Sequence, residues 1–166
     1  MGKVIMLWDL GEKQMINIKD VANFFISKSQ IGEGSIMTPL KLQKLCYYSQ
    51  AWSLVWDDKP LFDEEFQAWA HGPANYEIYN KYRKYKYHPI ECPDEDYRLD
   101  KFSKDEKETL EAVWDSYGIY EAKYLEGLTH QEEPWIKARG NCSNGERCSN
   151  IITVESMKEF YSKFTE

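Results

Sequence analysis

The stretch from Thr38 to Pro60 constrains the fold most, because it specifies one long helix and marks both of its ends. Thr38 suits the N-cap, since its hydroxyl can accept from a free backbone N–H of the first turn, and Pro39 suits the first helical position, which needs no N–H. Pro60 cannot continue a helix. Between these ends, apolar and aromatic residues recur at steps of three and four, at Leu42, Leu45, Tyr48, Trp52, Val55 and Trp56. We therefore predict a helix over residues 39–56 that forms the central packing element.

Cap signals and apolar spacing predict further helices on both sides of it. We expect helices over about 18–29, 74–84, 104–118 and 122–130, a short helical turn at Pro134-Trp135, and a last amphipathic helix that starts at Thr153 or Glu155. Alternation of apolar and polar residues from Phe66 to Trp69 predicts a short strand or extended pair. The predicted fold is mainly α: a compact single-domain helical bundle with a small β-hairpin near residues 60–70. The expected core residues are Leu42, Leu45, Trp52 and Trp69.

The length and the net charge of the chain limit the number of domains and the kinds of partner that it can bind. A chain of 166 residues suits one domain, and its net charge of −7 disfavours a broad nucleic-acid-binding surface. One basic cluster, Lys81 to Lys86 with interleaved tyrosines, could bind phosphates and stack on bases. We favour the simpler interpretation of a solvated helix end. No stretch of about 20 apolar residues is present, so we expect no membrane span and a cytoplasmic protein.

The four cysteines lack the close pairing of a metal site. Cys46 falls inside the main helix, where a buried thiol behaves as a small apolar residue. Cys142 and Cys148 flank a turn-rich loop, so a disulfide between them is an alternative to the free thiols expected in a reducing compartment. Neither a metal nor a cofactor is expected.

A catalytic site would have to start from Cys46, His71 and His130. Their spacing matches no nucleophile–base pattern, and the chain has no glycine-rich loop for nucleotide phosphates. We expect His71 to secure the turn before Gly72-Pro73, and His130 to pack at a helix end. The sequence thus predicts a protein that is not an enzyme.

Several motifs in a fixed order resemble the Panacea domain of SocA-like antitoxins and phage-associated proteins. The family shows a TPLKLQKLLYY-type helix, a following Trp, a KPLF turn, an AWxxGP ending and a downstream TH…PW segment. The matching positions here are Thr38, Pro39, Leu42, Leu45, Trp52, the 59–62 turn, Trp69, Gly72, Pro73, His130 and Trp135. The resemblance implies a domain over residues 15–166, preceded by an extension over 1–14, with Met15 as an alternative start.

The same resemblance implies an antitoxin that neutralises a cognate toxin, encoded beside it, by direct protein–protein binding. Alternatives are a proteolytic adaptor that delivers the toxin to a protease, or a phage-borne regulator or anti-defence protein. An acidic surface would speed encounter with a basic toxin. Our candidate toxin-binding residues adjoin the family motifs: Lys41, Lys44, His71, Tyr76, Tyr79 and Arg83.

Overall fold

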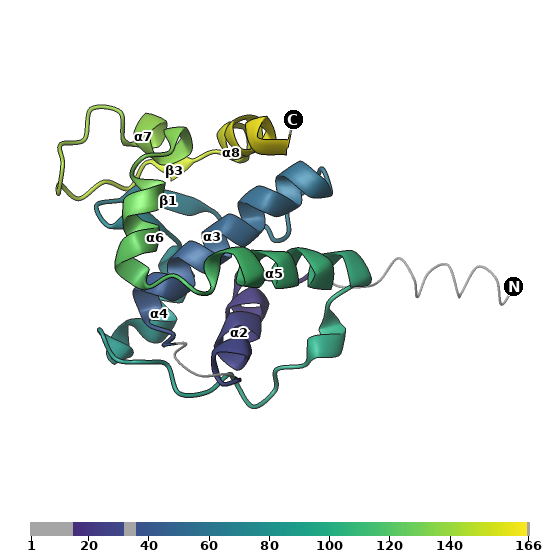
Figure 1. Cartoon of the computed structure of the whole chain (residues 1–166). Helices are drawn as coiled ribbons and strands as arrows, with labels where there is room; N and C mark the ends of the chain where they lie inside the picture. Colours follow the sequence, from purple (N-terminus) through teal and green to yellow (C-terminus); the bar gives the residue numbers. More distant parts are fainter. Residues whose placement is uncertain (1–14, 32–35, 166) are drawn as a thin grey trace, which may run out of the picture.

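Helices dominate the computed structural model, which describes residues 15–31 and 36–165 (Figure 1). The α-helices are α2 (Ile18–Ser29), α3 (Pro39–Trp56), α4 (Tyr76–Tyr82), α5 (Lys104–Tyr117), α6 (Ala122–Thr129), α7 (Glu133–Arg139) and α8 (Val154–Ser162). Short 3-10 helices span Arg83–Tyr85, Leu99–Lys101 and Lys163–Thr165. Three strands, β1 (Phe66–Trp69), β2 (Gly72–Ala74) and β3 (Ile151–Ile152), form an antiparallel sheet in the order β2-β1-β3. The predicted mainly α class with a small hairpin is confirmed. The predicted extension, residues 1–14, lies outside the described residues.

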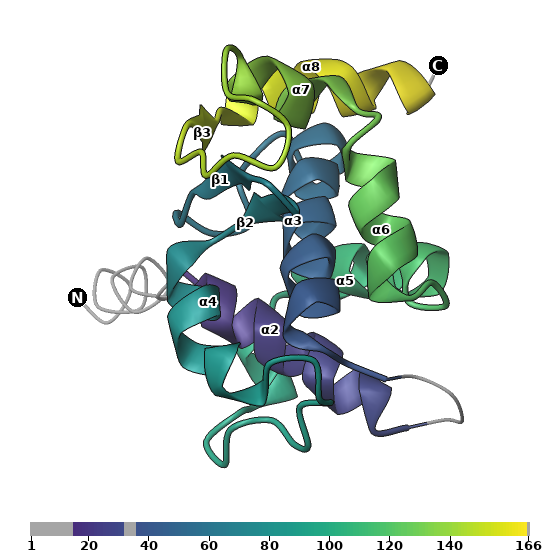
Figure 2. The same cartoon turned by 90° about the vertical axis from the view of Figure 1, so that its left-hand side faces the viewer.

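Helix α3 runs through the middle of the molecule with its predicted bounds (Figures 1 and 2). The Thr38 hydroxyl accepts from the Lys41 N–H at 3.3 Å, Pro39 takes the first helical position, and Asp58 follows the helix with a φ of 56°. Buried residues surround α3 on all sides from Lys41 to Ala51, rather than along one stripe. The reason is tertiary: α2, α5, α6, α8 and the sheet all pack against it.

Three other predicted helices start with side-chain caps. Asn17 and Asp20 form a capping box at α2, and Ser103 and Glu106 form another at α5. The Thr153 hydroxyl accepts from the Ser156 N–H at α8. Each cap satisfies N–H groups that a helix leaves free at its start.

The hairpin lies a few residues later than expected. Strands β1 and β2 pair Gln67 with Ala74 and Trp69 with Gly72, so the turn falls at Ala70 and His71. The predicted 74–84 helix starts late because Asn75 takes the N-cap, where its side chain accepts from the Ile78 N–H at 3.0 Å. Strand β3, which pairs with β1 from the loop before α8, was not predicted.

The core contains more tyrosine and less tryptophan than predicted. Leu42 and Leu45 are fully buried, as expected. Trp52 is partly buried and packs against the core, whereas Trp69 is partly buried outside the core cluster, so its prediction as a core residue is wrong. Tyr47, Tyr48 and Tyr161 are buried in their place. Their hydroxyls form one network, in which Tyr48 and Tyr161 donate to a Glu132 carboxylate oxygen at 2.8 and 2.7 Å and Tyr161 also contacts the Tyr47 hydroxyl. Partnered hydroxyls let these rings be buried at low cost.

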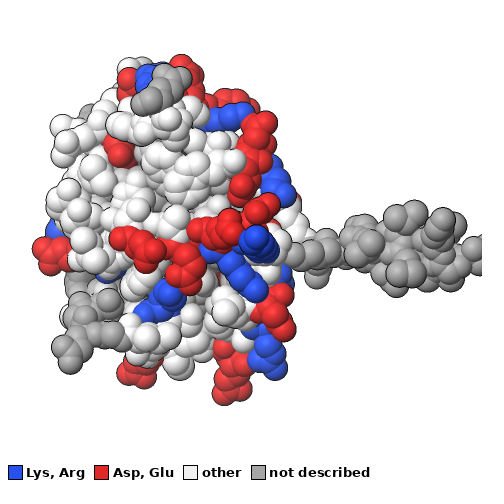
Figure 3. Space-filling model, turned by 45° about the vertical axis from the view of Figure 1, so that its right-hand side comes forward, with Lys and Arg blue, Asp and Glu red and all other residues white. Residues whose placement is uncertain are grey.

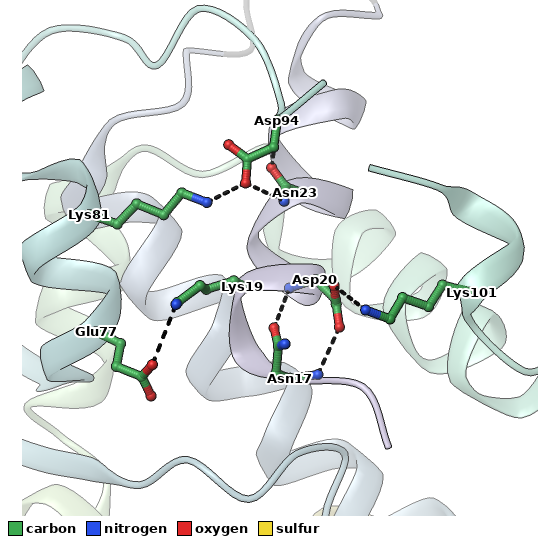
Figure 4. Close-up of polar contacts among 8 residues, drawn as sticks. All are labelled: Asn17, Lys19, Asp20, Asn23, Glu77, Lys81, Asp94 and Lys101. Carbon is green, nitrogen blue, oxygen red and sulfur yellow. Dashed lines mark hydrogen bonds and ion pairs between the residues drawn. The ribbon is translucent and has the colours of Figure 1, made fainter. Parts of the chain in front are cut away.

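The long connection between α4 and α5 is fastened by one aspartate (Figure 4). The Asp94 N–H donates to Asn23 Oδ1 at 3.0 Å, and its carboxylate accepts from Asn23 Nδ2 at 3.1 Å and from Lys81 Nζ. Lys81, a member of the predicted basic cluster, is therefore engaged in a structural ion pair. Among the helices of the described residues, none is both long and apolar enough to cross a membrane.

The cysteine prediction needs one correction. Cys142 and Cys148 form a disulfide, whereas free thiols were expected. The loop over residues 140–150 turns back on itself and brings the two Cα atoms to 6.2 Å, a separation that a disulfide can span. Cys46 is a free, fully buried thiol, as predicted.

Candidate functional site

Four segments that are distant in sequence enclose one groove of about 880 Å³. They are the start of α3, the β1–β2 hairpin, α4 with the residues that follow it, and the disulfide loop over 140–150. Figure 2 faces this side, with the hairpin and the disulfide loop above α4 and α3 beside them. The two predicted motifs around residues 38–45 and 68–73 thus meet at a single surface feature.

Three aromatic rings and one guanidinium form one wall of the groove. The centroid of the Trp69 ring lies 5.1 Å from that of Tyr79 and 6.4 Å from that of Tyr76. Tyr76 and Tyr79 are 57% and 41% exposed, and the Arg83 guanidinium lies 5.9 Å from the centre of the Tyr79 ring. The Asn75 cap sets this arrangement, because it starts α4 so that positions 76 and 79 share one face. We call these four residues the aromatic wall.

The floor of the groove holds a buried amine. Lys44 is 1% exposed, and its Nζ donates to the Pro73 carbonyl at 3.1 Å. Burial lowers the pKa of Lys44 to about 7, an effect that the nearby Glu126 carboxylate partly offsets. Gly72 makes room for this side chain, because a Cβ there would come within 2.7 Å of Lys44 Cε and 2.8 Å of Thr129 Oγ1.

Helices α6 and α7 support the hairpin from behind. His71 Nδ1 lies 3.3 Å from a Glu126 carboxylate oxygen, so this ring contacts α6, whereas we expected it to secure its own turn. His130 caps the end of α6 and stacks on Trp135 with ring centroids 4.1 Å apart, as the predicted packing role requires. Trp135 in turn donates its Nε1–H to the Trp69 carbonyl at 2.8 Å. Burial, the largest cause, lowers the pKa of His130.

A buried arginine holds the disulfide loop against the sheet. Arg139 is 4% exposed and donates to the carbonyls of Ala68 at 3.1 Å, of Glu146 at 3.0 Å and of Ser143. The bonds to Glu146 and Ser143 satisfy backbone oxygens of the loop, which has no regular secondary structure of its own, and the bond to Ala68 ties it to β1. They also bring Arg147 to the rim of the groove.

The structure brings five of the six predicted binding residues to this groove: Lys44, His71, Tyr76, Tyr79 and Arg83. Lys41 lies elsewhere, since it is buried with its Nζ 2.6 Å from the Gly118 carbonyl and 5.7 Å from the centre of the Trp114 ring. Sequence reasoning missed Trp69, Lys86, Tyr87 and Arg147. Lys86 and Tyr87 were part of a recognised basic and aromatic cluster, but Arg147 had no local signal.

The residues of a conceivable catalytic site do not assemble a nucleophile. Burial raises the pKa of the Cys46 thiol, which is the opposite of what a reactive thiolate needs. Across the part of the chain that the structure describes, no group of three His, Cys, Asp or Glu side chains is placed to hold a metal ion. The groove therefore offers aromatic faces and cationic groups for binding.

Comparison with known proteins gives a family. Neither the curated proteins nor the solved structures contain a match to this chain. The family described as antitoxin SocA-like, Panacea domain, matches residues 42–136, more than half of the chain. This range runs from α3 through the hairpin and α4 to Trp135 and Ile136 on α7, and so contains the aromatic wall and its support. The chain belongs to the SocA-like antitoxin family with a Panacea domain.

Proposed function

We propose that this protein is an antitoxin that neutralises a cognate toxin by direct protein–protein binding at the groove. The toxin would be encoded beside it, and both proteins would meet in the cytoplasm. Membership of an antitoxin family supports the general role. We choose the groove as the toxin-binding surface because of the aromatic wall, since Trp, Tyr and Arg contribute most of the binding energy at many protein interfaces.

The construction of the groove favours binding without large rearrangement. Its aromatic wall stands on a capped helix, and its hairpin is fastened by Lys44, Trp135 and Arg139 through backbone carbonyls. A preformed surface loses little conformational entropy when a partner docks, so more of the contact energy appears as affinity.

Growth assays test this proposal. The neighbouring gene is induced alone, with the wild-type chain, and with a Tyr79→Ala/Arg83→Ala double variant. We expect toxicity that the wild type relieves and the double variant does not, together with a loss of affinity of at least about tenfold for the purified pair. A Tyr124→Ala/Arg98→Ala variant is the matched control, since both residues are exposed and outside the groove.

The same strains separate direct neutralisation from delivery to a protease. A toxin that stays at constant level in a stable complex agrees with direct binding. A toxin whose half-life shortens only when this chain is present would show an adaptor instead. Full relief of toxicity by the Tyr79→Ala/Arg83→Ala variant would exclude the aromatic wall as the contact surface.

A further inference from the structure

The charges that line the groove have one sign, although the molecule as a whole is acidic. The chain carries 28 acidic and 21 basic side chains. The described residues that line the groove include Lys44, Arg83, Lys86 and Arg147, with His71 beside them, and neither Asp nor Glu. A concave surface lined by one sign of charge concentrates the field and attracts the opposite sign.

Three of these cations make no ion pair among the described residues, whereas Lys44 donates to the Pro73 carbonyl and His71 lies 3.3 Å from a Glu126 oxygen. Within the described ranges, no ion pair involves Arg83, Lys86 or Arg147, and all three side chains are exposed. Elsewhere the pattern is different: Lys28 pairs with Glu111 at 2.9 Å and Lys101 with Asp20 at 3.0 Å. Figure 3 shows such a mixed surface, with red and blue side chains interleaved on a face turned away from the groove. The three groove cations without an ion pair therefore remain available to a ligand.

The start of α3 adds to the same field. Pro39 and Leu40, its first two residues, line the groove, so the N-terminal end of an 18-residue helix borders it. The aligned peptide dipoles place a partial positive charge there. The unpaired side chains and the helix end thus favour the same kind of ligand.

We propose that the groove binds an acidic segment of a partner protein. One or more carboxylates of that segment lie among Arg83, Lys86 and Arg147, and a neighbouring aromatic or apolar side chain packs on Trp69, Tyr76 and Tyr79. The proposal rests on the antitoxin function for its partner, which is the toxin. It reverses the expectation of an acidic antitoxin surface that attracts a basic toxin, because the local charge of the groove is opposite to the net charge.

A protein segment fits these observations better than a nucleic acid. Binding to a phosphate backbone needs a track of many cations, whereas the described lining of this groove includes four, Lys44, Arg83, Lys86 and Arg147. Of the other cations in the basic cluster, Lys81 pairs with Asp94, and Lys84 is not among the residues that line the groove. The Trp69 ring also packs edge to face against Tyr76 and Tyr79, with an interplanar angle of 73° in each pair. Rings that pack against one another in this way are less suited to stacking on successive bases than a row of separate ring faces.

A peptide selection tests the proposal without the toxin. A displayed library of random dodecapeptides is selected on the immobilised full chain and counter-selected on an Arg83→Glu/Arg147→Glu variant. We expect enriched peptides that carry Asp or Glu next to an aromatic residue. A synthetic peptide of that sequence should bind the double variant at least tenfold more weakly, and should lose affinity as salt is raised.

The matched control is Arg98→Glu/Lys104→Glu, which makes the same change in net charge at exposed positions outside the groove. Peptide affinity should be unchanged in this control. If the Glu variant fails to fold by circular dichroism, Arg83→Gln/Arg147→Gln takes its place. Enrichment of neutral or basic peptides, no enrichment, or equal affinity for both double variants would overturn the proposal. Tighter binding of a twelve-nucleotide oligothymidylate than of any selected peptide would also overturn it.

The two proposals can fail separately. Absence of a toxic neighbour together with enriched acidic peptides would remove the antitoxin role and keep the acidic-segment site. Relief of toxicity that survives Arg83→Glu/Arg147→Glu, with no acidic peptides enriched, would keep the antitoxin role and remove the acidic-segment site.

Discussion

Lys44 places an ionisable amine where water hardly reaches. Its pKa in the folded protein is about 7, whereas the unfolded chain has the ordinary value of 10.5. Between these pH values the unfolded state binds more protons than the folded state, so the free energy of unfolding rises as the pH rises. The hydrogen bond to the Pro73 carbonyl does not oppose this, since a neutral amine also donates.

We predict that Lys44→Met removes this dependence on pH. From pH 7 to pH 9 the wild type should gain stability relative to the variant, by up to about 1.4 kcal/mol per pH unit. Urea unfolding of both proteins at pH 7, 8 and 9 measures the difference. The effects of the buried tyrosines cancel in this comparison, because both proteins contain them. Parallel stability curves would show that Lys44 does not titrate in this range.

Gly72 is the one position where the hairpin has no space for a side chain. Its φ of +102° is unfavourable for other residues, and a Cβ would meet Lys44 and Thr129. We predict that Gly72→Ala costs about 2–3 kcal/mol of stability and weakens partner binding, because the floor of the groove has to shift. Gly127→Ala is the matched control, since nothing lies within 4 Å of its Cβ and it is inside α6. It should stabilise by about 0.5–1 kcal/mol in the same thermal unfolding experiment.

Residue by residue, the sequence predicted burial well for aliphatic side chains and poorly for aromatic ones. Leu42 and Leu45 follow from helical spacing alone. Trp52 shares that spacing but stays half-buried, where its Nε1–H reaches the Tyr117 hydroxyl at 2.9 Å. Tyr161 is buried because Glu132, the N-cap residue of α7, accepts a hydrogen bond from its hydroxyl. The burial of these aromatic side chains depends on hydrogen-bond partners that are distant in sequence, and helical periodicity carries no information about such partners.

At the scale of elements, helix starts were predictable because their signals are local. The caps at Thr38, Ser103 and Thr153 each act within three residues. Strand β3 has only two residues and exists because β1 offers it a pairing edge. The disulfide loop has the same origin, since Arg139 seats it on the Ala68 carbonyl. Strand β3 thus depends on a tertiary contact, whereas the sequence indicated the turn-rich loop between Cys142 and Cys148 but not its attachment to the sheet.

We predict that reduction of the Cys142–Cys148 disulfide lowers the free energy of unfolding by about 2 kcal/mol. The bond closes a short loop of sequence separation 6, and the entropy that a crosslink removes from the unfolded chain is smallest for short loops. Thermal unfolding with and without a phosphine reductant measures the change. A Cys142→Ala/Cys148→Ala variant should unfold at the reduced protein's temperature and ignore the reductant. An equal shift in that variant would show that the reductant acts elsewhere.

For the whole molecule, the sequence identified the family and five of the residues that line the groove, but not the groove itself. Tyr76, Tyr79 and Arg83 were candidates because they adjoin a motif, and the structure adds that Trp69 and Arg147 face the same space. Arg147 lies far along the chain and reaches the groove only through the disulfide loop. The local charge of the groove was equally hidden, because composition reports the average over the whole surface.

The family match covers residues 42–136, yet the core of this molecule extends beyond that range on both sides. Phe24 and Phe25 of α2 and Met157 and Tyr161 of α8 are fully buried against the rest of the core. Burial of each such side chain contributes about 1.5–3 kcal/mol, and a domain is stable by only about 5–15 kcal/mol in total. A fragment without α2 and α8 therefore loses an amount comparable to its whole stability.

We predict that a 42–136 fragment does not fold, whereas a 15–166 fragment unfolds in one transition with the midpoint of the full chain. The second expectation follows because the described core begins at Ile16. Circular dichroism during urea titration tests both fragments. Addition of separate peptides for residues 15–41 and 137–166 to the short fragment should restore helical signal, because α2 and α8 supply the missing faces of the core. Cooperative unfolding of the 42–136 fragment alone would mean that α3, the hairpin and α6 form a sufficient core without these helices.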